Sequence, residues 1–129
     1  MCDILILDDD PAVLCSLVAF FEDRGLSVRG MATAEDALES LVHDPVRMAI
    51  VDLRLPGLDG DGFIREAMKR HEHLRFLIYT GSMDYVLDER FRSSSRVHGR
   101  VWSKPLVDME AFARAVMDEL ALSGKNRDG

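Results

Sequence analysis

Short apolar runs alternate along the chain with longer stretches in which apolar residues recur every three or four positions. The short runs predict strands at 3–7, 27–31, 48–51, 76–79 and 97–102. The periodic stretches are typical of amphipathic helices with one buried face, and they predict helices at 11–24, 34–42, 63–71 and 107–122.

Residues that start or stop helices support these boundaries. Pro11 fits the first turn of the first helix, Gly25 is suited to its end, and Thr33 can cap the second helix. The stretch "PGLDGDG", residues 56–62, is rich in turn residues and predicts a loop before the third helix.

The segment 82–95 has an ambiguous pattern. Tyr85, Val86 and Phe91 have helical spacing, whereas the three serines at 93–95 favour a frayed helix or a loop. Even so, strands alternate strictly with connecting segments long enough for helices. This alternation predicts a parallel sheet with helices on both faces, and right-handed crossovers make it a doubly wound α/β domain.

Charge and cysteine content narrow the classes of function. The 16 basic and 23 acidic residues give a net charge of −7, so no direct nucleic acid binding by this chain is expected. No apolar run approaches the roughly 20 residues that span a bilayer, and no basic flank precedes an apolar core as in a secretory signal. Cys2 and Cys15 lack metal-binding spacing, so a reduced, cytoplasmic setting is expected.

Polar residues stand directly after four of the predicted strands. They are Asp8, Asp9, Asp10, Asp52, Thr80, Gly81 and Lys104. Sheets of this kind bind ligands outside the carboxyl ends of their strands, where the strand order reverses. We therefore expect residues from separate strands to converge there on one small ligand.

The convergent acids require a counter-ion. A pair of like charges 4 Å apart costs about 4 kcal/mol at an effective dielectric constant near 20. A hard divalent cation removes this cost and prefers oxygen ligands, so Asp8, Asp9 and Asp52 point to Mg²⁺. Without the other strand ends, the same acids could be a solvated helix start, because carboxylates favour a helix N-terminus.

The remaining groups at these strand ends suit a phosphoryl group. Lys104 adds a fixed positive charge, Thr80 offers a hydroxyl, and Gly81 offers an unobstructed backbone N–H. Asp52 could then act as a nucleophile and accept the phosphoryl group as an acyl phosphate.

Four motifs in this order resemble the receiver domain of two-component response regulators. They are "LDDDP" at 7–11, "VDLRLPGLDG" at 51–60, "YTG" at 79–81 and "SKPL" at 103–106. With the alternation of elements, the resemblance implies a flavodoxin-like five-stranded parallel sheet with strand order 2-1-3-4-5 and helices on both faces. The receiver domain is expected over residues 1–122, with 123–129 as a polar, disordered tail.

The resemblance also implies a role for each site residue. Asp52 would be the phosphorylation site. Mg²⁺ would be held by Asp52, by Asp9 directly, by Asp8 often through water, and by the backbone carbonyl of Arg54.

Two further residues would act on the phosphoryl group. Lys104 would contact it, and Thr80 would reorient to bond it. Asp10 falls where the family often has an acidic residue that does not bind the metal directly, so it is left out of the metal-binding set.

One position departs from the family pattern. The family usually has Tyr or Phe three residues before the lysine, and here that position is Val101. Trp102 stands next to it, but adjacent strand residues face opposite sides of a sheet. The usual coupling of Thr80 to an aromatic residue is therefore in doubt, and loop or helix rearrangement is the alternative.

The function implied is a switch rather than an enzyme with ordinary turnover. A sensor histidine kinase or histidine phosphotransfer protein would phosphorylate Asp52 with the assistance of Mg²⁺. The changed conformation would control a downstream effector protein or a C-terminal output domain absent from this sequence. Homodimerisation through the last helix and its neighbours is left open.

Two alternatives come from other classes. A phosphatase of the haloacid dehalogenase type uses D-x-D-x-T; Asp8 and Asp10 fit it, but Ala12 occupies the threonine position. The second alternative is a docking or dimerisation module that works without phosphorylation.

Four arginines near the end of the chain's ambiguous segment have no acidic residue between the first and the last. They form a patch that is either solvated or a docking face for an acidic partner: Arg90, Arg92, Arg96 and Arg100.

Overall fold

A single parallel sheet organises the described part of the chain, with strand order β2-β1-β3-β4-β5. The computed structural model describes residues 2–55, 57–81 and 94–128, and side chains as far as Ser123. The strands are β1 (Cys2–Leu7), β2 (Val28–Met31), β3 (Val46–Asp52), β4 (Arg75–Thr80) and β5 (Trp102–Ser103). The observed order and parallel pairing confirm the predicted fold class.

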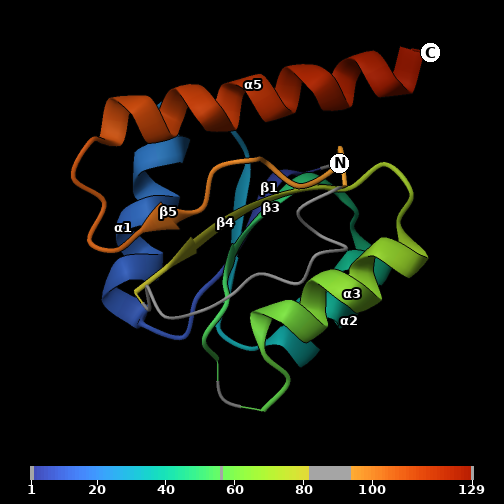
Figure 1. The fold of residues 1–129 in the computed structure, drawn as a ribbon, viewed down its shortest axis with the longest axis horizontal. Coiled ribbons are helices and arrows are strands. Elements are labelled where there is room, and N and C mark those ends of the chain that lie inside the picture. The colour runs from blue at the N-terminus through green and yellow to red at the C-terminus, as the bar shows by residue number, and fades with distance from the viewer. Residues whose placement is uncertain (1, 56, 82–93, 129) are drawn as a thin grey trace.

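Helices cover both faces of this sheet (Figure 1). They are α1 (Pro11–Glu22), α2 (Ala34–His43), α3 (Gly60–Arg70) and α5 (Met109–Asp128). The segment 82–95, whose pattern is ambiguous between helix and loop, falls almost entirely outside the described residues.

The two faces of the sheet carry separate apolar layers because alternate strand residues point in opposite directions. The strand residues that pack against α2 and α3 are Leu5, Leu7, Ala49, Val51, Phe76 and Ile78. Those that pack against α1 and α5 are Ile4, Ile6, Met48, Ile50, Leu77 and Tyr79. The central strands are thus buried on both sides, as expected for a parallel sheet under two helical layers.

Side-chain caps set the starts of the helices. The Asp10 carboxylate accepts hydrogen bonds from the backbone N–H groups of Ala12 and Val13 at the start of α1. Thr33 caps α2, as predicted, by accepting from the Asp36 N–H. Asp59 caps α3, which therefore begins at Gly60, three residues before the predicted start in a stretch read as loop.

The fifth strand is shorter than the predicted 97–102. Val97 forms one isolated bridge with Phe76, the chain then bends at Gly99, and regular pairing resumes only at Trp102. A glycine in a strand pattern commonly marks such a break.

The last helix also differs from its prediction at both ends. It starts after Asp108, whose carboxylate accepts the Ala111 N–H, rather than at Val107. It then continues to Asp128, six residues beyond the predicted end at 122. No proline interrupts this stretch, and adding residues to an existing helix costs much less than starting one.

Arg96, one of the four arginines of the predicted patch, has a structural role. Arg96 donates hydrogen bonds to the backbone carbonyls of Leu74, Met68 and His71, which closes the C-terminal end of α3. The prediction of an arginine patch that is solvated or a docking face is therefore wrong for Arg96. Arg100 lies over the Trp102 ring, 3.7 Å from its centroid. Arg90 and Arg92 lie outside the described residues.

Candidate functional site

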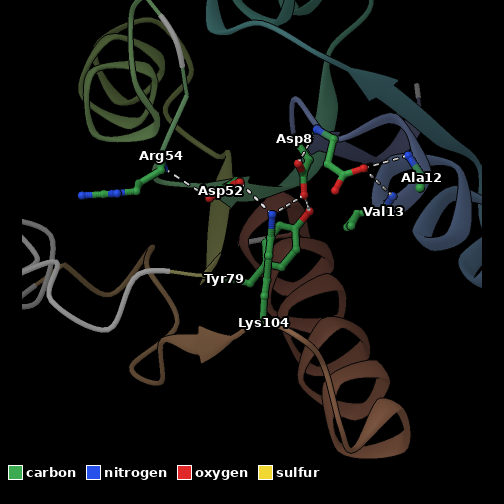
Figure 2. A network of polar contacts seen from close by, with 8 residues as sticks. Asp8, Ala12, Val13, Asp52, Arg54, Tyr79 and Lys104 are labelled. Carbon is green, nitrogen blue, oxygen red and sulfur yellow. Dashed lines mark hydrogen bonds and ion pairs between the residues drawn. The ribbon is translucent and has the colours of Figure 1, made fainter.

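Asp8 and Asp52 meet at the carboxyl end of the sheet, one just after β1 and the other at the end of β3. The Lys104 ammonium joins them: Nζ lies 2.6 Å from Asp8 Oδ2 and 2.7 Å from Asp52 Oδ2 (Figure 2). Both carboxylates are buried, with exposed fractions of 0% and 4%. The convergence expected from strand-end positions is therefore present in the structure.

Asp9 completes an acidic cluster. One carboxylate oxygen from each of Asp8, Asp9 and Asp52 lies within 4.8 Å of the others. Asp9 is exposed, whereas the other two are buried, so the cluster opens to solvent on the Asp9 side. Three carboxylates around one point match the oxygen ligands that Mg²⁺ prefers. The Lys104 ammonium already demonstrates that two of them accept a cation in common.

The loop after β3 holds the Asp52 side chain. The Arg54 N–H donates to Asp52 Oδ1 at 3.1 Å, and the Arg54 side chain points away from the carboxylates (Figure 2). This hydrogen bond fixes one oxygen and leaves Oδ2 beside Lys104.

Burial and neighbouring charges shift the protonation equilibria here. Burial raises the pKa of the Asp52 carboxyl, and the Asp8 charge raises it further; hydrogen bonds from Lys104 and Arg54 oppose this without cancelling it. Burial alone would lower the pKa of Lys104, but its hydrogen bonds and charge interactions with Asp52 and Asp8 dominate, so the net shift is upward. Lys104 is therefore a permanent cation in the site.

Thr80 and Gly81 lie beside this cluster at the end of β4. Thr80 is buried, and its carbonyl accepts the Lys104 N–H at 3.0 Å. A Cβ at Gly81 would lie 3.9 Å from the Lys104 Cβ, so Gly81 is next to the lysine side chain. The structure thus places both residues near Lys104, where the sequence predicts them.

The residues near the expected aromatic position face as predicted. Val101 is exposed, whereas Trp102 is buried and packs edge-on against Phe112, with ring centroids 5.4 Å apart. Trp102 therefore belongs to the core and does not replace an aromatic side chain at position 101.

Tyr79 contacts the site although the sequence pattern does not assign it there. This residue is fully buried on β4, and its hydroxyl donates a hydrogen bond to Asp8 Oδ2. Burial and the contact with Asp8 raise the pKa of Tyr79, so its hydroxyl remains a donor. The apolar run predicts a buried residue here, but nothing in the pattern identifies the partner of its hydroxyl.

Gly60 lets α3 start against the backbone of Asp52 and Leu53. A Cβ at this position would lie 2.2 Å from the Asp52 carbonyl oxygen and 2.7 Å from the Leu53 Cα. Both are backbone atoms that a rotamer change cannot move aside.

We therefore expect Gly60→Ala to lower the free energy of unfolding by about 1–3 kcal/mol, the usual cost of overpacking. Urea unfolding measures the change. Gly99→Ala is the control, since nothing lies within 4 Å of a Cβ there; we expect it to stay within about 0.5 kcal/mol of wild type. Equal stability of the two variants would contradict the close approach.

Comparison with known proteins supports one family. Residues 4–95 match the family described as "Response regulator receiver domain". Nodulation protein W of Bradyrhizobium diazoefficiens is 29% identical over 113 residues, which cover 88% of this chain and 49% of that protein. Transcriptional regulatory protein AruR of Pseudomonas aeruginosa is 34% identical over 88 residues, 36% of its length. The chain therefore spans about half or less of the length of these relatives.

Solved structures agree with this match. A response regulator receiver domain protein (CheY-like) from Methanospirillum hungatei JF-1 superposes with a TM-score of 0.84 at 25% identity and covers 98% of both chains. The signal receiver domain of an HD domain-containing protein from Pseudomonas fluorescens Pf-5 has the same fold, with a TM-score of 0.86. None of the described helices is long and apolar enough to span a membrane. The chain belongs to the response regulator receiver domain family of two-component systems.

Proposed function

We propose that this receiver domain accepts a phosphoryl group on Asp52 from a sensor histidine kinase or a histidine phosphotransfer protein. The observation that carries the proposal is the buried Asp52 carboxylate, paired with Lys104 and clustered with Asp8 and Asp9. A receiver domain is a signalling switch rather than a classical enzyme, so the dehalogenase-type phosphatase loses its support.

The proposed metal is Mg²⁺, held by Asp8, Asp9, Asp52 and the backbone carbonyl of Arg54. When bound, the ion would supply positive charge against the phosphoryl oxygens. The acidic cluster supports this assignment because its oxygens lie within 4.8 Å of one another. The residue set is the one implied by the family resemblance, and the donor chemistry fits a hard cation.

In the proposed reaction, the phosphoryl group moves from the donor to Asp52. An Asp52 oxygen attacks phosphorus, the bond from phosphorus to the donor breaks, and the donor leaves. Lys104 turns from the carboxylates to the new phosphoryl oxygens, and Thr80 and the Gly81 N–H bond them as well. The Arg54 N–H keeps the Asp52 side chain in place, since it already holds Oδ1.

The donor would approach over an open, mainly apolar groove of about 680 Å³ beside Lys104. Its walls include Val13 and Phe20 of α1, Leu106 from the loop after β5, and Met109 at the start of α5. The phosphorylated state would then regulate a downstream effector protein or an output domain. Moving a two-state equilibrium from mostly off to mostly on requires about 5.5 kcal/mol of differential binding.

The chemical nature of the product tests this function. Incubation with acetyl phosphate and Mg²⁺ is expected to add one phosphoryl group, seen by intact mass, and EDTA should prevent it. Hydroxylamine should then remove the group, because it cleaves acyl phosphates but leaves phosphate esters of Ser, Thr and Tyr intact. Absence of labelling in the presence of Mg²⁺ would favour the alternative docking module, and hydroxylamine-resistant labelling would exclude an aspartyl phosphate.

A further inference from the structure

The Tyr79 side chain lies in the core, and its hydroxyl contacts the acidic cluster through Asp8. Tyr79 is on β4, level with Asp52 on β3 and with Trp102 on β5. Its hydroxyl donates to Asp8 Oδ2, the same oxygen that accepts the Lys104 ammonium (Figure 2). Asp8 Oδ1 accepts the Asp10 N–H at 2.8 Å. Both oxygens of a fully buried carboxylate are thus engaged by protein donors.

The Tyr79 ring is held where it is by packing. It lies against Phe112, with ring centroids 6.2 Å apart, and it belongs to the apolar layer under α1 and α5. The Lys104 Nζ lies 4.7 Å from the centroid of the same ring. One rigid side chain therefore contacts Asp8 through its hydroxyl and Lys104 through its face.

We propose that Tyr79 is a positioning residue that orients the Asp8 carboxylate for the cation. The inference rests on the proposed function, in which Lys104 leaves Asp8 for the phosphoryl group. Asp8 then loses one donor to Oδ2, and the Tyr79 hydroxyl is the donor that the packed ring keeps in place. Without this hydrogen bond, the buried carboxylate can rotate away from the orientation in which its oxygens face the cation.

A buried tyrosine hydroxyl usually finds some partner, so a hydrogen bond alone would be ordinary packing. The identity of the partner makes the difference, because Asp8 is a member of the only cluster of three potential metal ligands among the described residues. Groups that hydrogen-bond metal-binding carboxylates typically change metal affinity by about 10–100-fold when they are replaced.

Tyr79→Phe tests the inference because it removes the hydroxyl and keeps the ring. Wild type and variant are titrated with MgCl₂, and the Kd is read from the backbone amide shifts of Asp10 and Arg54 in ¹H–¹⁵N NMR spectra. We expect the variant to bind Mg²⁺ about ten-fold more weakly. At saturating Mg²⁺, it should still be labelled by acetyl phosphate, because Asp52 and Lys104 are intact.

Phe21→Leu is the matched control. Phe21 is fully buried in the same apolar layer and packs against Phe112, with ring centroids 6.0 Å apart, so the variant should lower stability and leave the Mg²⁺ Kd within about two-fold of wild type, far below the change expected at the Asp8 hydrogen bond. An unchanged or tighter Kd in Tyr79→Phe would overturn the inference, as would an equal loss in Phe21→Leu. Failure of the wild type to bind Mg²⁺ would instead overturn the proposed function, and the inference with it.

Discussion

Asp52→Asn is expected to abolish labelling by acetyl phosphate, whereas the wild type gains one phosphoryl group. Asparagine has nearly the same shape and can still accept the hydrogen bond that the Arg54 N–H gives to Asp52 Oδ1. Its neutral amide lacks the anionic oxygen that attacks phosphorus. The variant should also fold, because it removes one of two buried carboxylates that share the Lys104 ammonium, and Asp8 still pairs with that ammonium. Intact mass after incubation with Mg²⁺ gives the result directly.

Asp59→Asn is the control for this experiment. Asp59 lies in the same connection between β3 and α3, but it caps the helix, and asparagine is an equally good cap. We expect full labelling of this variant. Labelling that persists in Asp52→Asn and disappears in Asp8→Asn would identify Asp8 as the nucleophile and revive the dehalogenase-type mechanism.

The location of the site at the carboxyl end of the sheet could be predicted, because all strands of a parallel sheet end on the same side. Asp8, Asp52 and Lys104 are separated along the chain, but each follows a predicted strand, and the structure joins them through one ammonium. The opposite orientations of Val101 and Trp102 follow from strand alternation in the same way. These features follow from the alternation of strands with helices and from the alternating orientation of residues along a strand.

Other features depend on contacts that no local pattern encodes. Tyr79 has the pattern of a core residue, and only the packed structure brings its hydroxyl to Asp8. Arg96 lies in a stretch rich in arginine and serine, yet it binds three backbone carbonyls near the end of α3. The early start of α3 is a different case, because Asp59 is a local capping signal that lies within a glycine-rich stretch resembling a loop.

Lys104→Met is expected to make the stability of the domain depend on Mg²⁺. Lys104 is the ammonium shared by Asp8 and Asp52, and both carboxylates are buried. Removing one partner of a buried ion pair costs about 3–5 kcal/mol, because it leaves charge without compensation. We expect a loss of this size in urea unfolding with EDTA at neutral pH. Excess MgCl₂ should recover much of it, since a cation at the acidic cluster again neutralises the carboxylates.

The pH dependence of the same variant follows from the Asp52 carboxyl. Burial already raises its pKa in the wild type, and without Lys104, which lowers that pKa, it should rise further. A carboxyl with a raised folded-state pKa is penalised above that pKa, because the unfolded chain loses its proton first. The penalty is absent below the unfolded-state pKa and grows as pH rises through the folded-state value. The stability deficit of Lys104→Met in EDTA should therefore shrink as the solution is made acidic.

Lys69→Met is the control for both measurements. Lys69 is an exposed lysine on α3, 3.5 Å from Glu66, and its side chain is 66% exposed. Surface pairs of this kind contribute about 0–1 kcal/mol, so the control should respond to neither Mg²⁺ nor acidification. If Lys104→Met were as stable as Lys69→Met in EDTA, the two carboxylates would not need the ammonium. A cation would then have no uncompensated charge to neutralise, and the electrostatic reason for placing Mg²⁺ at the carboxyl end of the sheet would be lost.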